Sequence, residues 1–141
     1  YDEEFYKALG GYADYCITNL PWINPKTTMS QALLKAFNKA YPNDLFEMNI
    51  GFTFEAILIA ADAAKRAGST EPKALLEALP TTNITEHVMI GGPIVFDAKG
   101  QNGNTRSATI QNFGSKPMVV FPAEAAEAKA VFPVPGWQQR G

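Results

Sequence analysis

The segment from Ile50 to Ala67 places the strongest constraint on how this chain can fold. Its apolar residues recur at the i, i+3, i+4 and i+7 spacing of an α-helix, and further apolar residues widen the stripe on both flanks. Lys65 and Arg66 suit the negative C-terminal end of a helix dipole, and Gly68 suits a left-handed cap. A helix this apolar requires sheet and helices on most of its sides, which predicts a layered fold.

Further helices are predicted on both sides of this segment. Thr27 or Thr28 can cap a helix whose apolar positions run from Met29 to Tyr41, and Pro72 can start a short Leu-rich helix. The remaining candidates are a helix before the first glycine pair and one after Pro122. Together the predicted helices cover residues 3–9, 29–41, 50–67, 72–79 and 123–127.

Short segments rich in β-formers are the predicted strands. They cover residues 15–18, 93–96, 108–113 and 118–121, and the last two are expected to pair as a hairpin. A Gly/Asn-rich stretch at 97–104 is expected to be a turn region. Strand, helices and then strands predict an α/β or α+β unit.

Composition excludes several functional classes. The 141 residues are 46% hydrophobic and 18% charged, which is typical of an ordinary globular chain. The net charge of -2 and the lack of a basic cluster argue against nucleic acid as a partner. Cys16, the single cysteine, cannot form an intrachain disulfide or a Cys-rich zinc site. The longest apolar run, residues 56–61, is far shorter than the roughly 20 residues that cross a bilayer.

No catalytic residue, metal site or cofactor is predicted. His87, the single histidine, lies in a polar segment without a nucleophile motif, and we expect it to be solvated in a loop. His87 and Glu86 are too few ligands for a metal. The segment 97–104 faintly resembles a calcium loop, but Lys99 stands where a ligand oxygen is needed. The acidic residues of 2–4 and 124–127 are expected to cap helices or face solvent.

Several motifs occur in an order that is known from one protein family. The run Gly51–Leu79 combines an aromatic-acidic-Ala helix start with an Ala-Gly-Ser turn and a Leu-rich helix. Downstream follow a Gly-x-x-x-Phe-Asp-x-x-Gly hairpin at 92–100, a strand pair at 110–122 and a Pro-Gly-Trp ending at 135–137. In this order the chain resembles the C-terminal third of periplasmic solute-binding proteins of the branched-chain amino-acid (Leu/Ile/Val-binding, type I) family of ABC transporters.

The resemblance implies a type I periplasmic-binding-protein-like α/β fold, to which this chain contributes parts of both lobes. Residues 1–20 would belong to lobe 2, residues 21–110 to lobe 1 and residues 111–141 to lobe 2 again. The chain would cross between lobes near Leu20 and near Gln111. The rest of both lobes would come from the N-terminal remainder of the same protein, which is thereby an expected partner.

The implied function is capture of a small amino-acid-like or aromatic/carboxylate solute between the lobes, with delivery to an ABC permease in the membrane. The expected location is the periplasm, and no reaction is expected. Two alternatives stay open at this point. The chain could be part of a ligand-sensing regulator or receptor of the same fold, or a non-catalytic subunit of an α/β enzyme.

The resemblance also implies a ligand-binding site. Asn49 stands at the family's cleft-facing position before the helix aromatic, and Met48 and Phe52 are its neighbours. The alternative for Met48 and Phe52 is ordinary core packing. Trp22, just past the first crossing, could cover an aromatic or apolar ligand, or pack in the hinge. Because the branched-chain amino-acid binders have an aromatic residue where Asn49 stands, the ligand need not be Leu, Ile or Val.

Overall fold

The computed structural model describes residues 2–140, so the outermost positions of the predicted segments 1–20 and 111–141 lie outside the described residues. Helices combine with one three-stranded sheet, which confirms the α/β class. The elements are α1 (Glu3–Leu9), β1 (Ile17–Pro21), α2 (Thr28–Ala40), α3 (Met48–Ala67), α4 (Pro72–Ala78), β2 (Ser107–Asn112) and β3 (Pro117–Phe121). Short 3₁₀ helices follow at Gly10–Ala13, Leu79–Thr81 and Trp137–Gln139.

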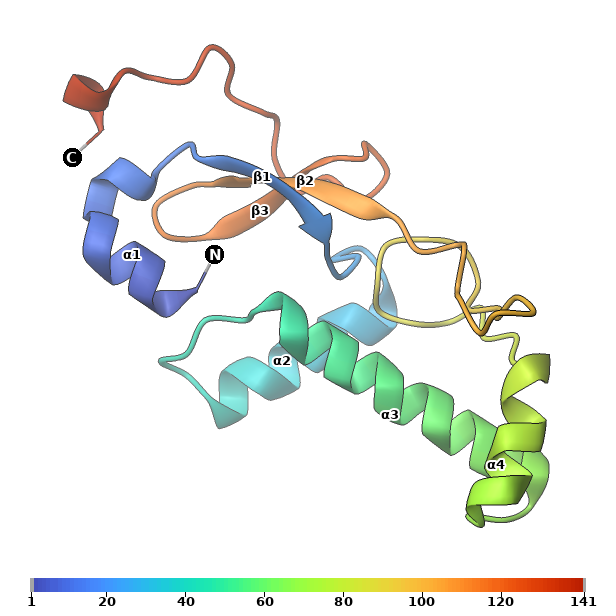
Figure 1. Ribbon diagram of the computed structural model, residues 1–141. Helices are drawn as coiled ribbons and strands as arrows, with labels where there is room; N and C mark the ends of the chain where they lie inside the picture. Colours follow the sequence, from blue (N-terminus) through green and yellow to red (C-terminus); the bar gives the residue numbers. More distant parts are fainter. Residues whose placement is uncertain (1, 141) are drawn as a thin grey trace.

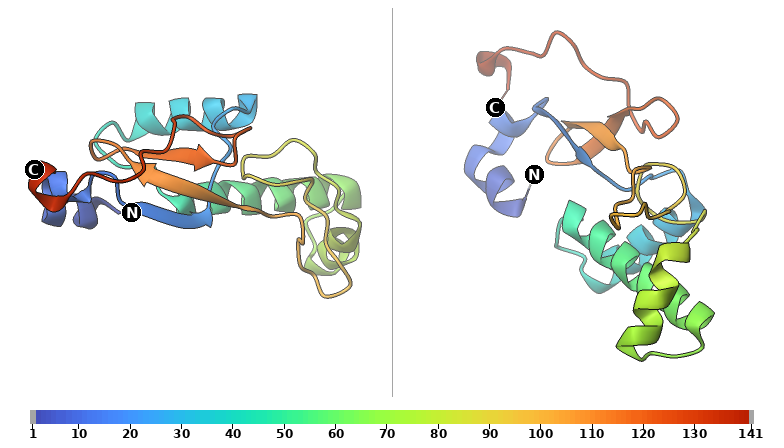
Figure 2. Two further views of the ribbon diagram at one scale, coloured as in Figure 1. Left: turned by 90° about the horizontal axis from the view of Figure 1, so that it is seen from above. Right: turned by 45° about the vertical axis from the view of Figure 1, so that its right-hand side comes forward.

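The molecule has two ends of different character. Figure 1 shows α1, the sheet and the C-terminal tail toward one end, and the helices α2, α3 and α4 toward the other. The two further views show α4 at the far end of α3 and the C-terminal end beside α1, and the left-hand view shows α2 running alongside the sheet (Figure 2). The chain passes between the two ends along β1 and returns along β2.

The sheet has the order β1-β2-β3, and both neighbouring pairs are antiparallel. The predicted hairpin of β2 and β3 is confirmed. In the register of β1 and β2, Leu20 is opposite Ala108 and Ile17 is opposite Gln111. The two positions where the chain is predicted to cross between lobes therefore lie on adjacent strands.

Local sequence signals explain the ends of the helices. The Thr27 hydroxyl accepts a hydrogen bond from the backbone N–H of Ser30, at 3.2 Å, and so caps α2. Gly68 ends α3 in the left-handed conformation with φ of 61°. The Arg66 side chain donates to the Ala78 carbonyl and to the Thr81 and Thr82 hydroxyls, which fastens the end of α3 to the end of α4. The predicted helices at 29–41, 50–67 and 72–79 are thus confirmed to within two residues at each end.

The core lies where β1, the start of α3 and the segment 88–90 meet. Ile23 and Met89 face each other in an isolated antiparallel bridge, and both contact α3 close to Gly51. A side chain at Gly51 would have no room, because a Cβ there would be 2.7 Å from Ile23 Cγ2 and 2.9 Å from Met89 Sδ. The buried cluster comprises Trp22, Ile23, Phe46, Val88, Met89, Ile90, Ala108, Ile110, Val119 and Ala125.

Two predicted elements are wrong. Residues 93–96 form no strand, because they make only single bridges, Ile94 to Ile84 and Phe96 to Asn102. Residues 123–127 form turns instead of a helix. The amide of Glu127 bonds to the Val119 carbonyl at 2.8 Å, and its carboxylate accepts from the Val119 amide at 3.1 Å. Pairing with β3 has taken the place of a helical hydrogen bond here, so Glu127 is exposed as expected but does not belong to a helix.

Within the described residues α3 is not covered on most sides. Of its residues, Gly51 and Ala63 are buried, whereas Phe52 is 38% exposed and Ile57 is 64% exposed. Leu76 of α4 is 68% exposed. These helices therefore present apolar side chains that residues 2–140 do not cover.

Candidate functional site

Three of the four predicted ligand-binding residues lie together at the start of α3. Asn49 is exposed, Phe52 is exposed one turn later, and Met48 is half-buried against the core. Trp22 lies elsewhere: it is 5% exposed and its ring meets that of Phe46 edge-on at 6.5 Å. The structure thus brings Met48, Asn49 and Phe52 to one helix end and places Trp22 in the adjoining core.

Asn49 lines an open groove between α2 and α3. The groove has a volume of about 480 Å³ and its walls are mostly apolar. Its polar groups come from the side chains of Asn49 and Thr53 and from the hydroxyl of Tyr41. The lining residues are Leu33, Phe37, Tyr41, Asn49, Ile50, Thr53, Phe54 and Ile57.

A second cavity adjoins this groove and involves α1. Its volume is about 390 Å³, and Phe37, Tyr41 and Ile50 line both spaces. The second cavity adds Glu3 from α1 and the residues Asp44, Leu45 and Glu47 from the α2–α3 connection. A small molecule in this space would contact both α1 and the α2–α3 pair.

Three carboxylates surround the second cavity and make it electronegative. Glu3 is partly balanced by Lys7, whose ammonium is 2.7 Å away, but Asp44 and Glu47 have no ion-pair partner among the described residues. Aromatic rings and Ile50 form the opposite lining. This combination suits a solute with a cationic group and an apolar body.

Trp22 lines a third cavity, of about 280 Å³, together with Phe46 and Leu34. Asp44 and Leu45 line this cavity as well as the one that Glu3 enters. Trp22 therefore does not share a cavity with Asn49, and its contact with Phe46 fits the packing role that was the alternative for it. Met48 and Phe52 line none of the three spaces.

Sequence reasoning missed most of the side chains that line these cavities. Phe37 and Tyr41 had been assigned only to the apolar face of α2, and their rings indeed lie 5.3 Å apart on that helix. Asp44 and Glu47 lie in a connection without any motif. The sequence signal that could have indicated these lining residues is the concentration of aromatic and acidic residues between Phe37 and Glu47. It ends two positions before Asn49.

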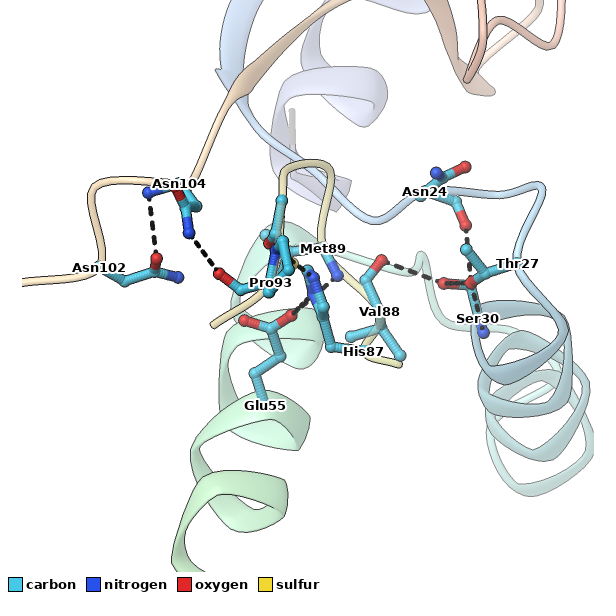
Figure 3. A network of polar contacts seen from close by, with 11 residues as sticks. Asn24, Thr27, Ser30, Glu55, His87, Val88, Met89, Pro93, Asn102 and Asn104 are labelled. Carbon is cyan, nitrogen blue, oxygen red and sulfur yellow. Dashed lines mark hydrogen bonds and ion pairs between the residues drawn. The ribbon is translucent and has the colours of Figure 1, made fainter. Parts of the chain in front are cut away.

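The expectation of a solvated His87 is wrong. The residue is buried; its Nδ1 lies 2.7 Å from Glu55 Oε1 and its Nε2 lies 3.0 Å from the Gly92 carbonyl oxygen (Figure 3). The hydrogen bond to Glu55 and the negative charge of that carboxylate raise the pKa of His87, and they outweigh the opposing effect of burial. The polar loop around His87 packs on α3, so that the imidazole faces Glu55 instead of water.

The segment 97–104, the possible metal ligands and the apolarity of the helices were also considered from the sequence. The Asp97 carboxylate accepts from the amides of Lys99 and Gln101, which confirms a turn at this position. Among residues 2–140 no group of three or more His, Cys, Asp and Glu side chains is placed to hold a metal ion. None of the helices in the same range combines the length and apolarity that a bilayer crossing requires.

Comparison with known proteins adds one match. A family model described as "Periplasmic binding protein" matches residues 1–116. That range covers most of the chain and includes the helices α1 to α4 and the strands β1 and β2. No curated protein matches the chain.

Proposed function

The chain belongs to the periplasmic binding protein family, and from this membership we propose that it is part of an extracytoplasmic protein that captures a small solute between two lobes and presents it to an ABC permease. Members of the family bind solutes and are generally not enzymes. A ligand that contacts both lobes favours the closed form through its differential affinity for that form. The closed form is what a membrane permease would recognise.

We place the lobes along the chain as residues 1–20 and 111–141 for one lobe and residues 21–110 for the other. The adjacency of β1 and β2 supports this division, since two crossings of one hinge must lie side by side. The separation of α1 and the C-terminal tail from α2–α4 also supports it (Figure 1). The missing sheet and helices of both lobes would come from the N-terminal remainder of the same protein.

The observation on which the site rests is the cavity that Glu3 lines together with Phe37 and Ile50. In the proposed division, Glu3 belongs to one lobe and the other two residues belong to the second lobe. The groove at Asn49 continues this space through shared lining residues. We therefore assign solute binding to this region, with Asn49 as the hydrogen-bonding side chain; Met48 and Phe52 adjoin Asn49 at the start of α3, and Trp22 packs in the adjoining core.

The charge of the cavity narrows the class of solute. Carboxylates of Glu3, Asp44 and Glu47 favour a solute with an ammonium group and disfavour a dicarboxylate, because like charges repel at short range. The rings of Phe37 and Tyr41 suit an apolar or aromatic side chain on that solute. The ammonium group and the side chain of an amino-acid-like solute meet both conditions, and its own carboxylate would point away from Glu3, Asp44 and Glu47.

The substitution Asn49→Ala tests this site in the intact protein. It removes one hydrogen bond, so we expect a solute affinity about tenfold weaker and an unfolding midpoint close to that of the wild type. Calorimetric titration with a solute that co-purifies with the protein measures the first quantity, and thermal unfolding measures the second. Asn83→Ala is the matched control, because Asn83 is exposed and lines none of the three cavities. Equal affinities for wild type and Asn49→Ala would remove Asn49 from the site.

A further inference from the structure

His87 faces hydrogen-bond acceptors at both of its ring nitrogens. Nδ1 is 2.7 Å from the Glu55 carboxylate and Nε2 is 3.0 Å from the carbonyl oxygen of Gly92, which can only accept. Both nitrogens must therefore be protonated for both bonds to form. The side chain of His87 is 8% exposed and that of Glu55 is 12% exposed, so water contributes little to this arrangement.

The same carboxylate also holds the backbone next to His87. Glu55 Oε1 also accepts from the Met89 amide at 2.9 Å, so Glu55 bonds α3 to both His87 and Met89, and Nε2 of His87 adds a bond to Gly92 within the segment 87–92 (Figure 3). No second buried ion pair joins α3 to another element within residues 2–140.

The segment that His87 fastens is central to the packing of the helices. The Val88 carbonyl accepts from the Asn24 amide at 2.7 Å and from the Ser30 hydroxyl at 3.1 Å. The Ile90 amide donates to the Trp22 carbonyl at 2.8 Å. Residues 88–90 therefore connect α3 to α2 and to the end of β1.

Few charges other than Glu55 surround the imidazole. From α3 it meets Glu55, and from its own loop the neighbouring charge is Glu86, which lines the same cavity of about 260 Å³. The side chains that the segment 24–29 contributes to that cavity are Asn24, Thr27, Thr28 and Met29, and all four are neutral. Glu55 is therefore the charge that decides the protonation of His87.

We propose that the imidazolium of His87 is a proton-dependent clamp that fastens α3 to the segment 87–92. When the proton is lost, one ring nitrogen presents a lone pair to an oxygen lone pair, and one of the two bonds is replaced by repulsion. Because Glu55 raises the pKa of His87, the clamp persists to a higher pH than an ordinary imidazolium would and loosens as the pH rises further. The inference does not depend on solute binding, because every contact in it joins residues of the chain itself.

Nitrogen NMR of the histidine ring in the intact protein tests the clamp directly. In the wild type we expect both ring nitrogens of His87 to stay protonated above its ordinary pKa of about 6.5. Glu55→Gln keeps the shape of the side chain but removes its charge, and we expect it to lower the midpoint toward the ordinary value. Glu86→Gln makes the same change of charge on an adjacent, unbonded residue and is expected to leave the midpoint close to the wild-type value.

Hydrogen exchange of the wild type gives a reading that needs no variant. We expect exchange at the Met89 amide to accelerate with pH more steeply than exchange at the Leu75 amide of α4, whose bond to the Glu71 carbonyl is remote from His87. A wild-type midpoint at or below the ordinary value would overturn the clamp. Equal shifts in the two Glu→Gln variants, or parallel exchange of the two amides, would overturn it as well.

Discussion

The raised pKa of His87 couples the stability of the fold to pH. Protonated His87 gains its bonds to Glu55 and Gly92 on folding, whereas the unfolded residue titrates near 6.5. A group whose pKa is higher in the folded state contributes stability that is complete below the unfolded pKa. That contribution disappears as the pH rises through the folded pKa.

We therefore predict that the free energy of unfolding of the intact protein decreases as the pH is raised from below 6.5 through the folded pKa of His87. In Glu55→Gln this decrease should be smaller, because the folded and unfolded pKa values of His87 come closer together. Urea unfolding over a series of pH values measures both curves. Identical pH dependence in the two proteins would mean that Glu55 does not hold the proton on His87.

Contacts between distant residues were the part of the site that the sequence could not reveal. His87 and Glu55 are 32 positions apart, and the aromatic-acidic-Ala helix start that contains Glu55 does not point to His87, so the polar neighbours of His87 favoured a solvated position. The family resemblance predicted Asn49 as a cleft-facing residue just before the helix, and its exposure at the start of α3 agrees with access to a ligand. Glu3 and Asp44 could not be connected by sequence, because their proximity depends on how α1 is placed against the α2–α3 connection.

At the scale of elements, predictability followed the strength of the local signal. The helices α2, α3 and α4 have strong periodicity, caps and proline signals, and these outweigh tertiary effects. The segments 93–96 and 123–127 are short, and their backbone groups are satisfied by bridges and by β3. For short segments the tertiary partner decides the structure, and this partner is not contained in local sequence.

The close packing of α3 against the bridge of Ile23 and Met89 makes a prediction at Gly51. Gly51→Ala would place a Cβ 2.7 Å from Ile23 Cγ2, and Ile23 is buried and β-branched, so it cannot move aside cheaply. We expect a loss of roughly 1–3 kcal/mol in the free energy of unfolding despite the better helix propensity of alanine. The measurement is denaturant unfolding of the intact protein.

Gly103→Ala provides the matched control for that substitution. A Cβ at Gly103 meets no atom within 4 Å, and Gly103 is not among the glycines with positive φ. Its free energy of unfolding should stay close to the wild-type value or rise slightly. If Gly51→Ala were as stable as Gly103→Ala, then α3 would not pack closely against the bridge between Ile23 and Met89.

At the scale of the whole molecule, the proposed division between two lobes predicts apolar surface that residues 2–140 leave exposed. Ile57 and Leu76 on the helices and Phe121 on β3 are all more than half exposed. The three-stranded sheet has two edges, and residues 2–140 place no further strand beside either of them. An N-terminal remainder that completes both lobes would cover these surfaces.

We predict that residues 1–141 expressed alone will be aggregated or molten, because their apolar faces lack partners. Near-ultraviolet circular dichroism and thermal unfolding measure this, with the intact protein as the reference. Sharp side-chain signals and a cooperative melt of the piece by itself would contradict the division of this chain between two lobes.

Native mass spectrometry of the intact protein tests solute capture most directly. The protein is mixed with an equimolar pool of amino acids, aromatic acids, dicarboxylates and amides, sprayed under native conditions and then sprayed again under denaturing conditions. We predict one 1:1 adduct that survives competition, belongs to the amino-acid-like class and is released on denaturation. A protein that retains no member of the pool, and releases no small molecule acquired during expression, would contradict its assignment as a solute-binding protein.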